Sequence, residues 1–172
     1  MSCTCTCNQA IEVIGLCDPA SITFDNTNRN WTEISVPEVL TIPCQKPNIE
    51  SIEKVFVKVK IISKRVVPTP SADVPNEEGT LLSGWKLVVE GIIKQKIVYT
   101  ADVPQQSIHS ACFDVPFSAF IILPENTELE DSFCVDVCVE DVFVKAFNSR
   151  DIFKNVTLFL RAYPDPGTSG CA

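Results

Sequence analysis

Three thiols alternate with hydroxyl side chains at the start of the chain, in the sequence MSCTCTCNQ. In an extended segment, successive side chains point to opposite sides, so Cys3, Cys5 and Cys7 would share one side, about 6.6 Å apart in steps of two residues. That spacing is at the limit for pairing among themselves. It is well suited to meeting thiols on a second strand. The chemistry that this segment predicts is disulfide cross-linking.

The number of cysteines is high for a chain of 172 residues. A reducing cytosol rarely favours so many, because disulfides persist in oxidising surroundings. The number is also odd, so pairing within one chain must leave at least one thiol for reaction or for a bond to another chain. The nine cysteines are Cys3, Cys5, Cys7, Cys17, Cys44, Cys112, Cys134, Cys138 and Cys171.

The elements that must position these thiols are β-strands. Alternating, β-branched stretches bounded by Pro, Asn and Asp recur along the chain, and no segment shows a sustained 3.6-residue period. This pattern predicts an all-β fold, an antiparallel β-sandwich or jelly roll with an extended N-terminal arm. Gly91 predicts a bulge or a close backbone approach, and Pro116 an edge or a bend. The expected strands are 54–67, 85–100, 112–123, 133–147 and 155–162, with shorter ones at 12–16, 21–24 and 31–42.

Composition changes at both ends of the chain. Residues 1–9 are small and polar with three cysteines, and residues 164–172 (PDPGTSGCA) combine chain breakers with Cys171. We therefore expect a cysteine-rich arm at 1–9, one β-sandwich domain at 10–163, and a C-terminal tail at 164–172.

Strand alternation also assigns faces to two cysteines of the fourth strand. Phe133, Val135, Val137 and Val139 share one face, which is apolar and predicts core. Cys134, Asp136, Cys138 and Glu140 share the other, and its carboxylates predict a solvated surface. Four residues of strand span about 13 Å, so Cys134 and Cys138 cannot bond to each other while the strand is intact.

These observations support one hypothesis of function. The N-terminal arm reaches a neighbouring copy, adds a strand to its sheet edge and is locked there by disulfides. Cys134 and Cys138 are the first candidate receptors, Cys17 is the next, and Cys171 on the other tail could act in the same way. Cys44 and Cys112 are expected to be buried or structural.

Charge and hydropathy exclude several partners. The formal net charge is −8, whereas phosphate binding needs a surplus of Lys and Arg, so nucleic acid is not expected. No apolar run reaches the roughly 18 residues that a membrane span requires. The N-terminus lacks a basic region followed by an apolar stretch, so we expect synthesis in the cytosol without a signal peptide.

Metal binding and catalysis are the rival chemistries. Cys-x-Cys-x-Cys resembles thiolate-rich metal sites, and a thiol-rich metal-binding protein stays an alternative. Structural zinc favours Cys-x₂₋₄-Cys pairs, however, and the one such pair lies on an expected strand. His109 is the single His and lies at a turn near Cys112, an unpromising base for a nucleophile. We expect no catalytic residue, no cofactor and no metal site.

The stretch NWTEISVPEVLTIPCQKPNIESI (30–52) resembles the SPOCS-type domain of bacterial spore coat proteins. A second block, LVVEGIIKQKIVYTAD (87–102) followed by HSACFDVPFSAFIIL (109–123), resembles it as well, and the two suggest a domain over about 30–162. The matching residues of the first block are Trp31, Pro37, Glu38, Leu40, Ile42, Pro43, Gln45, Lys46, Pro47, Ile49 and Glu50.

This resemblance implies a β-rich scaffold in spore coat or exosporium assembly. It also explains how a protein made in a reducing cytosol can carry many cysteines for disulfides. A spore-surface protein is made in the mother-cell cytoplasm and meets an oxidising exterior after lysis. The extra cysteines resemble those of cysteine-rich exosporium or spore-appendage proteins. We expect a structural protein of the spore surface that self-assembles into a fibre or lattice. The alternative is a non-polymeric adaptor that recruits other coat proteins.

Overall fold

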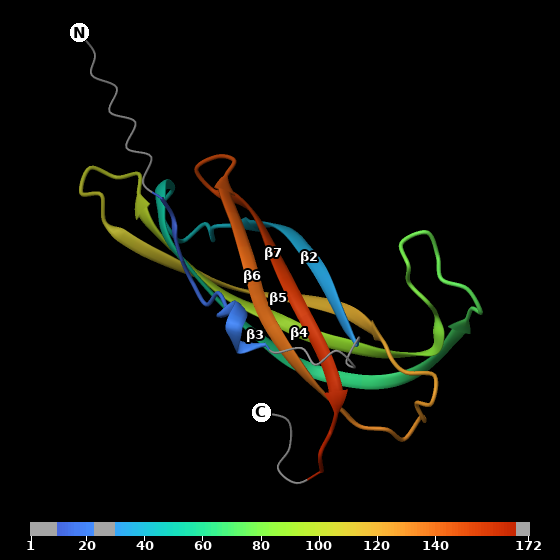
Figure 1. Cartoon of the computed structure of the whole chain (residues 1–172). Helices are drawn as coiled ribbons and strands as arrows, with labels where there is room; N and C mark the ends of the chain where they lie inside the picture. The colour runs from blue at the N-terminus through green and yellow to red at the C-terminus, as the bar shows by residue number, and fades with distance from the viewer. Residues whose placement is uncertain (1–9, 23–29, 168–172) are drawn as a thin grey trace.

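The chain folds into a β-sandwich of two sheets, shown in Figure 1 by a computed structural model that describes residues 10–22 and 30–167. The described elements are β1 (Glu12–Ile14), the short 3₁₀ turn η1 (Pro19–Ser21), β2 (Trp31–Thr41), β3 (Ile49–Ser71), β4 (Ser83–Ala101), β5 (Ile108–Ile122), β6 (Phe133–Ala146) and β7 (Asp151–Pro164).

The first sheet has four strands in the order β1-β3-β4-β5. Strands β3, β4 and β5 form an antiparallel meander, whereas the short β1 runs parallel to β3 and pairs with it only at 54–56. The β3–β4 hairpin is long and curved, and its loop projects away from the three-stranded sheet at one end of the molecule (Figure 1).

The second sheet has three strands in the order β2-β7-β6, all antiparallel. Central strand β7 buries every second residue from Ile152 to Ala162 against the first sheet. In the first sheet, strand β4 likewise buries every second residue from Leu87 to Ala101, against the second sheet. Each fully buried aliphatic side chain stabilises the fold by about 1.5–3 kcal/mol, so these two central strands supply much of the core.

Gly91 lies where β4 meets a crowded part of the core. A Cβ added to it would lie 2.6 Å from ring atoms of Phe117 and 2.9 Å from the Lys60 carbonyl oxygen. Its partner on β3 is Ile61, and the register shifts between Ile61 and Ser63. The predicted close approach at Gly91 is confirmed, and the unpaired residue of the bulge beside it is Ile62 of β3.

The all-β sandwich and each of the longer predicted strands are confirmed. Strand β5 with Pro116 is an edge strand, as expected. At 21–24, Ser21 ends η1 instead of starting a strand, and residues 23–24 lie outside the described part. Residues 1–9 and the end of the tail, including Cys171, also lie outside it. The described residues include no helix with the length and apolar character needed to cross a membrane.

Candidate cross-linking site

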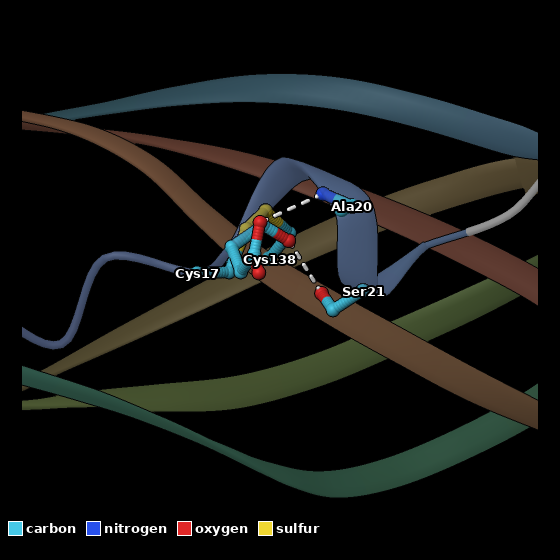
Figure 2. The surroundings of a disulfide bond; sticks show 5 residues. Cys17, Ala20, Ser21 and Cys138 are labelled. Atoms are coloured by element: carbon cyan, nitrogen blue, oxygen red, sulfur yellow. Dashed lines mark hydrogen bonds between the residues drawn. A yellow bond between two sulfur atoms is a disulfide. The ribbon is translucent and has the colours of Figure 1, made fainter.

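A disulfide joins the N-terminal segment to the three-stranded sheet. Cys17 bonds to Cys138 of β6, with 5.3 Å between their Cα atoms and 121 residues between them in sequence. The Cys17 backbone N–H also donates to the Val139 carbonyl at 3.0 Å. Figure 2 shows η1 beside this bond, where Asp18 accepts hydrogen bonds from Ala20 N–H and the Ser21 hydroxyl. The segment thus pairs with β3 of one sheet and bonds to β6 of the other.

The predicted faces of β6 are correct, but the predicted solvation of its cysteine face is wrong. Val135, Val137 and Val139 pair with the inward residues of β7, so they do face the core. Cys138 is nevertheless only 6% exposed, because the segment carrying Cys17 covers it. Asp136 forms an ion pair with Arg161 of β7. The Asp136 carboxylate on this face is therefore explained by its ion pair with Arg161 and does not indicate an open surface around Cys138.

Cys134 is buried too, at 1% exposed, and offers no free thiol. The inference that Cys134 and Cys138 do not bond to each other holds, since Cys138 bonds to Cys17. Cys17 and Cys138 were both predicted to receive a neighbour's arm, and the structure instead uses both within the chain.

The free thiols of the described residues are Cys44 and Cys112, and both are exposed. This corrects the expectation that they are buried or structural. Cys44 lies in the turn after β2, outside the core. Cys112 lies on β5, where Ala111 and Phe117 face inward and Cys112 faces outward next to Lys96 of β4. Strand alternation puts Cys112 on the face opposite the buried Ala111, which accounts for its exposure.

Strand β5 is an open edge beside one of these thiols. Among the described residues it pairs with β4 on one side and with no strand on the other. An edge strand presents unpaired backbone donors and acceptors to an incoming chain. Residues 108–115, which precede Pro116 and include Cys112, therefore form a surface on which another strand could pair. We call these residues the β5 edge.

A buried polar cluster links the two sheets elsewhere in the sandwich. The Lys154 ammonium on β7 is fully buried and lies 2.7 Å from Glu38 Oε1 on neighbouring β2. The same oxygen accepts a hydrogen bond of 2.6 Å from Nε2 of Gln95, a 4% exposed residue of β4 in the opposite sheet. Burial lowers the pKa of Lys154, and the hydrogen bond to Glu38 opposes that shift. Glu38 Oε2 and Gln95 Oε1 have no hydrogen-bond partner among the described residues.

The sequence reasoning missed this cluster, although a signal was present. Strand alternation places Lys154 between Ile152 and Val156, and Gln95 between Ile93 and Ile97, on core-facing positions. Polar side chains at such positions are buried only when they are paired.

The structure bears on metal binding only within residues 10–22 and 30–167. No group of three or more His, Cys, Asp or Glu residues there could hold a metal ion. The Cys3-Cys5-Cys7 segment lies outside these residues, so its metal alternative stays open. The His109 ring stacks on Tyr99, and its Nε2 lies 3.1 Å from Ser107 Oγ.

Removing the disulfide should destabilise the body. A disulfide that closes a long loop restricts the unfolded chain and typically contributes about 2–4 kcal/mol. We expect C17S/C138S to lower the free energy of unfolding by that amount, measured by urea denaturation of oxidised protein. The control C44S/C112S removes two exposed free thiols and should change it by less than about 0.5 kcal/mol. Equal stability of C17S/C138S and the oxidised wild type would show that this bond does not form.

Comparison with known proteins gives one family. The family model described as SipL, SPOCS domain, matches residues 48–146, more than half of the chain. The match spans β3, β4, β5 and β6. It includes the block at 87–123 and only the end of the block at 30–52. No curated protein and no solved structure matches the chain.

Proposed function

This chain belongs to the SPOCS-domain family and is a spore-associated protein, and from that premise we propose that it is a structural protein of the endospore surface. It would self-assemble into a fibre or lattice through β-strand addition and inter-subunit disulfides. The coat, exosporium or an appendage of the spore would hold the assembly. The role is structural, not catalytic, and the main partner is a second copy of the chain.

The observation that carries the proposal is the exposed free thiol of Cys112 on the open β5 edge. A neighbour's residues 1–9 would pair with this edge as an added strand. Directly opposed residues of paired strands have their side chains on the same face, with Cα atoms about 4.5–5.5 Å apart. That separation lies within the range that disulfides span, about 4.4–6.8 Å.

The alternation of the arm thiols fits this arrangement. Cys3, Cys5 and Cys7 would all lie on one face of the added strand, so shifts of register by two residues still place a thiol opposite Cys112. Cys44, the other exposed free thiol of the described residues, remains for further links between subunits. Head-to-tail contacts of this kind form a closed ring only when the rotation between successive subunits completes a circle. Otherwise they continue from subunit to subunit, so they favour filaments or sheets.

Electrophoresis and electron microscopy of the purified, air-oxidised chain test the proposal. We expect a ladder or material too large to enter a non-reducing gel, its collapse to monomer with reductant, and regular assemblies in the microscope. Monomer in both lanes would favour the adaptor alternative. Bound zinc or copper in chelator-free protein, with no assemblies, would favour the metal-binding alternative.

A further inference from the structure

We propose that the side chains of Lys154 and Gln95 react to form an isopeptide bond, promoted by Glu38, that covalently joins the two sheets. This bond would form whether or not chains assemble through cysteines. Its reacting groups belong to the cluster at the centre of the sandwich, which holds an amine, a carboxylate and a carboxamide away from water. Residues flanking the three on the same strand faces are Val36, Leu40, Ile93, Ile97, Ile152 and Val156.

The geometry brings the nucleophile and the acyl group to one oxygen atom. Lys154 Nζ lies 2.7 Å from Glu38 Oε1, and Gln95 Nε2 lies 2.6 Å from the same atom. The two nitrogens can therefore be no further apart than the sum of these distances. Cδ is bonded to Nε2, so it also lies close to this oxygen atom, and the reaction would require the Gln95 side chain to turn its Cδ towards the amine. Because Gln95 comes from the opposite sheet, the amine and the amide are held together by the packing of the two layers.

The surroundings favour an uncharged amine. Lys154 is 0% exposed, and burial lowers the pKa of its ammonium group. Proton transfer from Lys154 to Glu38 would remove both formal charges from a dry site. A carboxyl group protonated on Oε2 could then donate to Gln95 Oε1, and neither of these two oxygen atoms has a hydrogen-bond partner among the described residues. One proton shift thus satisfies both atoms and polarises the amide carbonyl.

The reaction balances without any other reagent. The Lys154 Nζ lone pair attacks Gln95 Cδ, and the amine loses its second proton as the tetrahedral centre forms. Glu38 carries a proton to the amide nitrogen, the bond between Cδ and Nε2 breaks, and the nitrogen leaves as ammonium, which takes both protons that Lys154 has lost. A new bond between Cδ and Nζ remains, and Glu38 returns to its starting state. No atom changes oxidation state. Glu38 contacts both reacting groups, so it is the catalytic residue of this single turnover.

The mass of the wild-type chain tests the proposal directly. The protein should be folded, then denatured, fully reduced and alkylated so that disulfides do not contribute. We expect an intact mass lower than the sequence predicts by one molecule of ammonia. Digestion after glutamate leaves Gln95 in peptide 91–125 and Lys154 in peptide 141–172. Tandem mass spectrometry should find these two peptides joined through Gln95 and Lys154.

Variants assign the chemistry to the cluster. E38Q keeps the size of the side chain but cannot accept the ammonium proton, and K154M removes the nucleophile, so both should lose the mass deficit completely. The control K94M replaces an exposed lysine adjacent to Gln95 and should keep the deficit. An unmodified wild-type mass would overturn the proposal. So would a deficit of ammonia mapped elsewhere, or a deficit of water with Lys154 joined to Glu38.

Discussion

Replacing Cys3, Cys5 and Cys7 together with Ser should abolish nearly all covalent assemblies of the oxidised protein while leaving the body folded. The three residues are small and polar after substitution, so an extended segment can still pair with the β5 edge through its backbone. Without sulfur, that contact is an edge pairing of a few residues, which is weak in water. The measurement is the fraction of protein above monomer size in non-reducing electrophoresis, with circular dichroism as the test of folding.

A matched pair of variants tests which body thiol accepts the arm of the neighbouring chain. C112S removes the free thiol on the β5 edge, and C44S removes the other exposed free thiol of the described body. We expect C112S to reduce cross-linking strongly and C44S to reduce it little. Unchanged assemblies in the triple arm variant would remove the arm from the mechanism. Equal losses in C112S and C44S would contradict docking at the β5 edge.

Glu38→Ala should destabilise the folded body by about 3–5 kcal/mol relative to chains in which Lys154 is unreacted, since removing one partner leaves a buried, uncompensated ammonium. Lys154 is 0% exposed, and its pKa is lowered by burial, with Glu38 as the opposing influence. The variant also takes away the carboxylate oxygen to which Gln95 donates. Urea unfolding of the variant and the wild type, under the same redox conditions, gives the difference.

A double variant separates the orphaned charge from the loss of packing. E38L/K154M replaces both members of the ion pair with apolar side chains of similar size. Such replacements are often neutral or stabilising for buried pairs, so the double variant should recover the part of the loss that comes from the ammonium. If E38L/K154M is as unstable as the sum of its single variants, the two residues do not interact as the structure indicates.

Strand alternation predicted much of the architecture from sequence, because the core of a sandwich repeats every two residues. It placed Val135, Val137 and Val139 inward and Gly91 at a close approach, and the structure agrees with both. Strand alternation could not predict that another segment of the chain covers the outward face of β6. The segment around Cys17 lies far from β6 in sequence, and only tertiary contact brings it over Cys138.

The cysteine environments show the limit of local reasoning. Asp136 suggested a solvated surface next to Cys134 and Cys138, but Arg161 pairs with it from a neighbouring strand. Cys112 was expected to be buried or structural, yet it is exposed, because it faces the opposite side of β5 from its neighbour Phe113. In both cases the neighbour in sequence was less informative than the neighbour across the sheet. The polar cluster was accessible to the same reasoning, because Lys154 and Gln95 occupy core-facing positions of regular strands.

The central claim is that arm thiols bond to a different polypeptide, and isotope mixing tests it most directly. Chains grown with natural nitrogen and with ¹⁵N are mixed as reduced monomers, oxidised together and digested without reduction. Mass spectrometry then identifies each cystine peptide pair as uniform or mixed in isotope. The Cys17–Cys138 pair should be uniform, because it closes within one chain. Peptides that contain Cys3, Cys5 or Cys7 should be joined to Cys112 peptides in mixed pairs. If every cystine of the arm is uniform in isotope, the arm closes on its own chain and the assembly mechanism is contradicted.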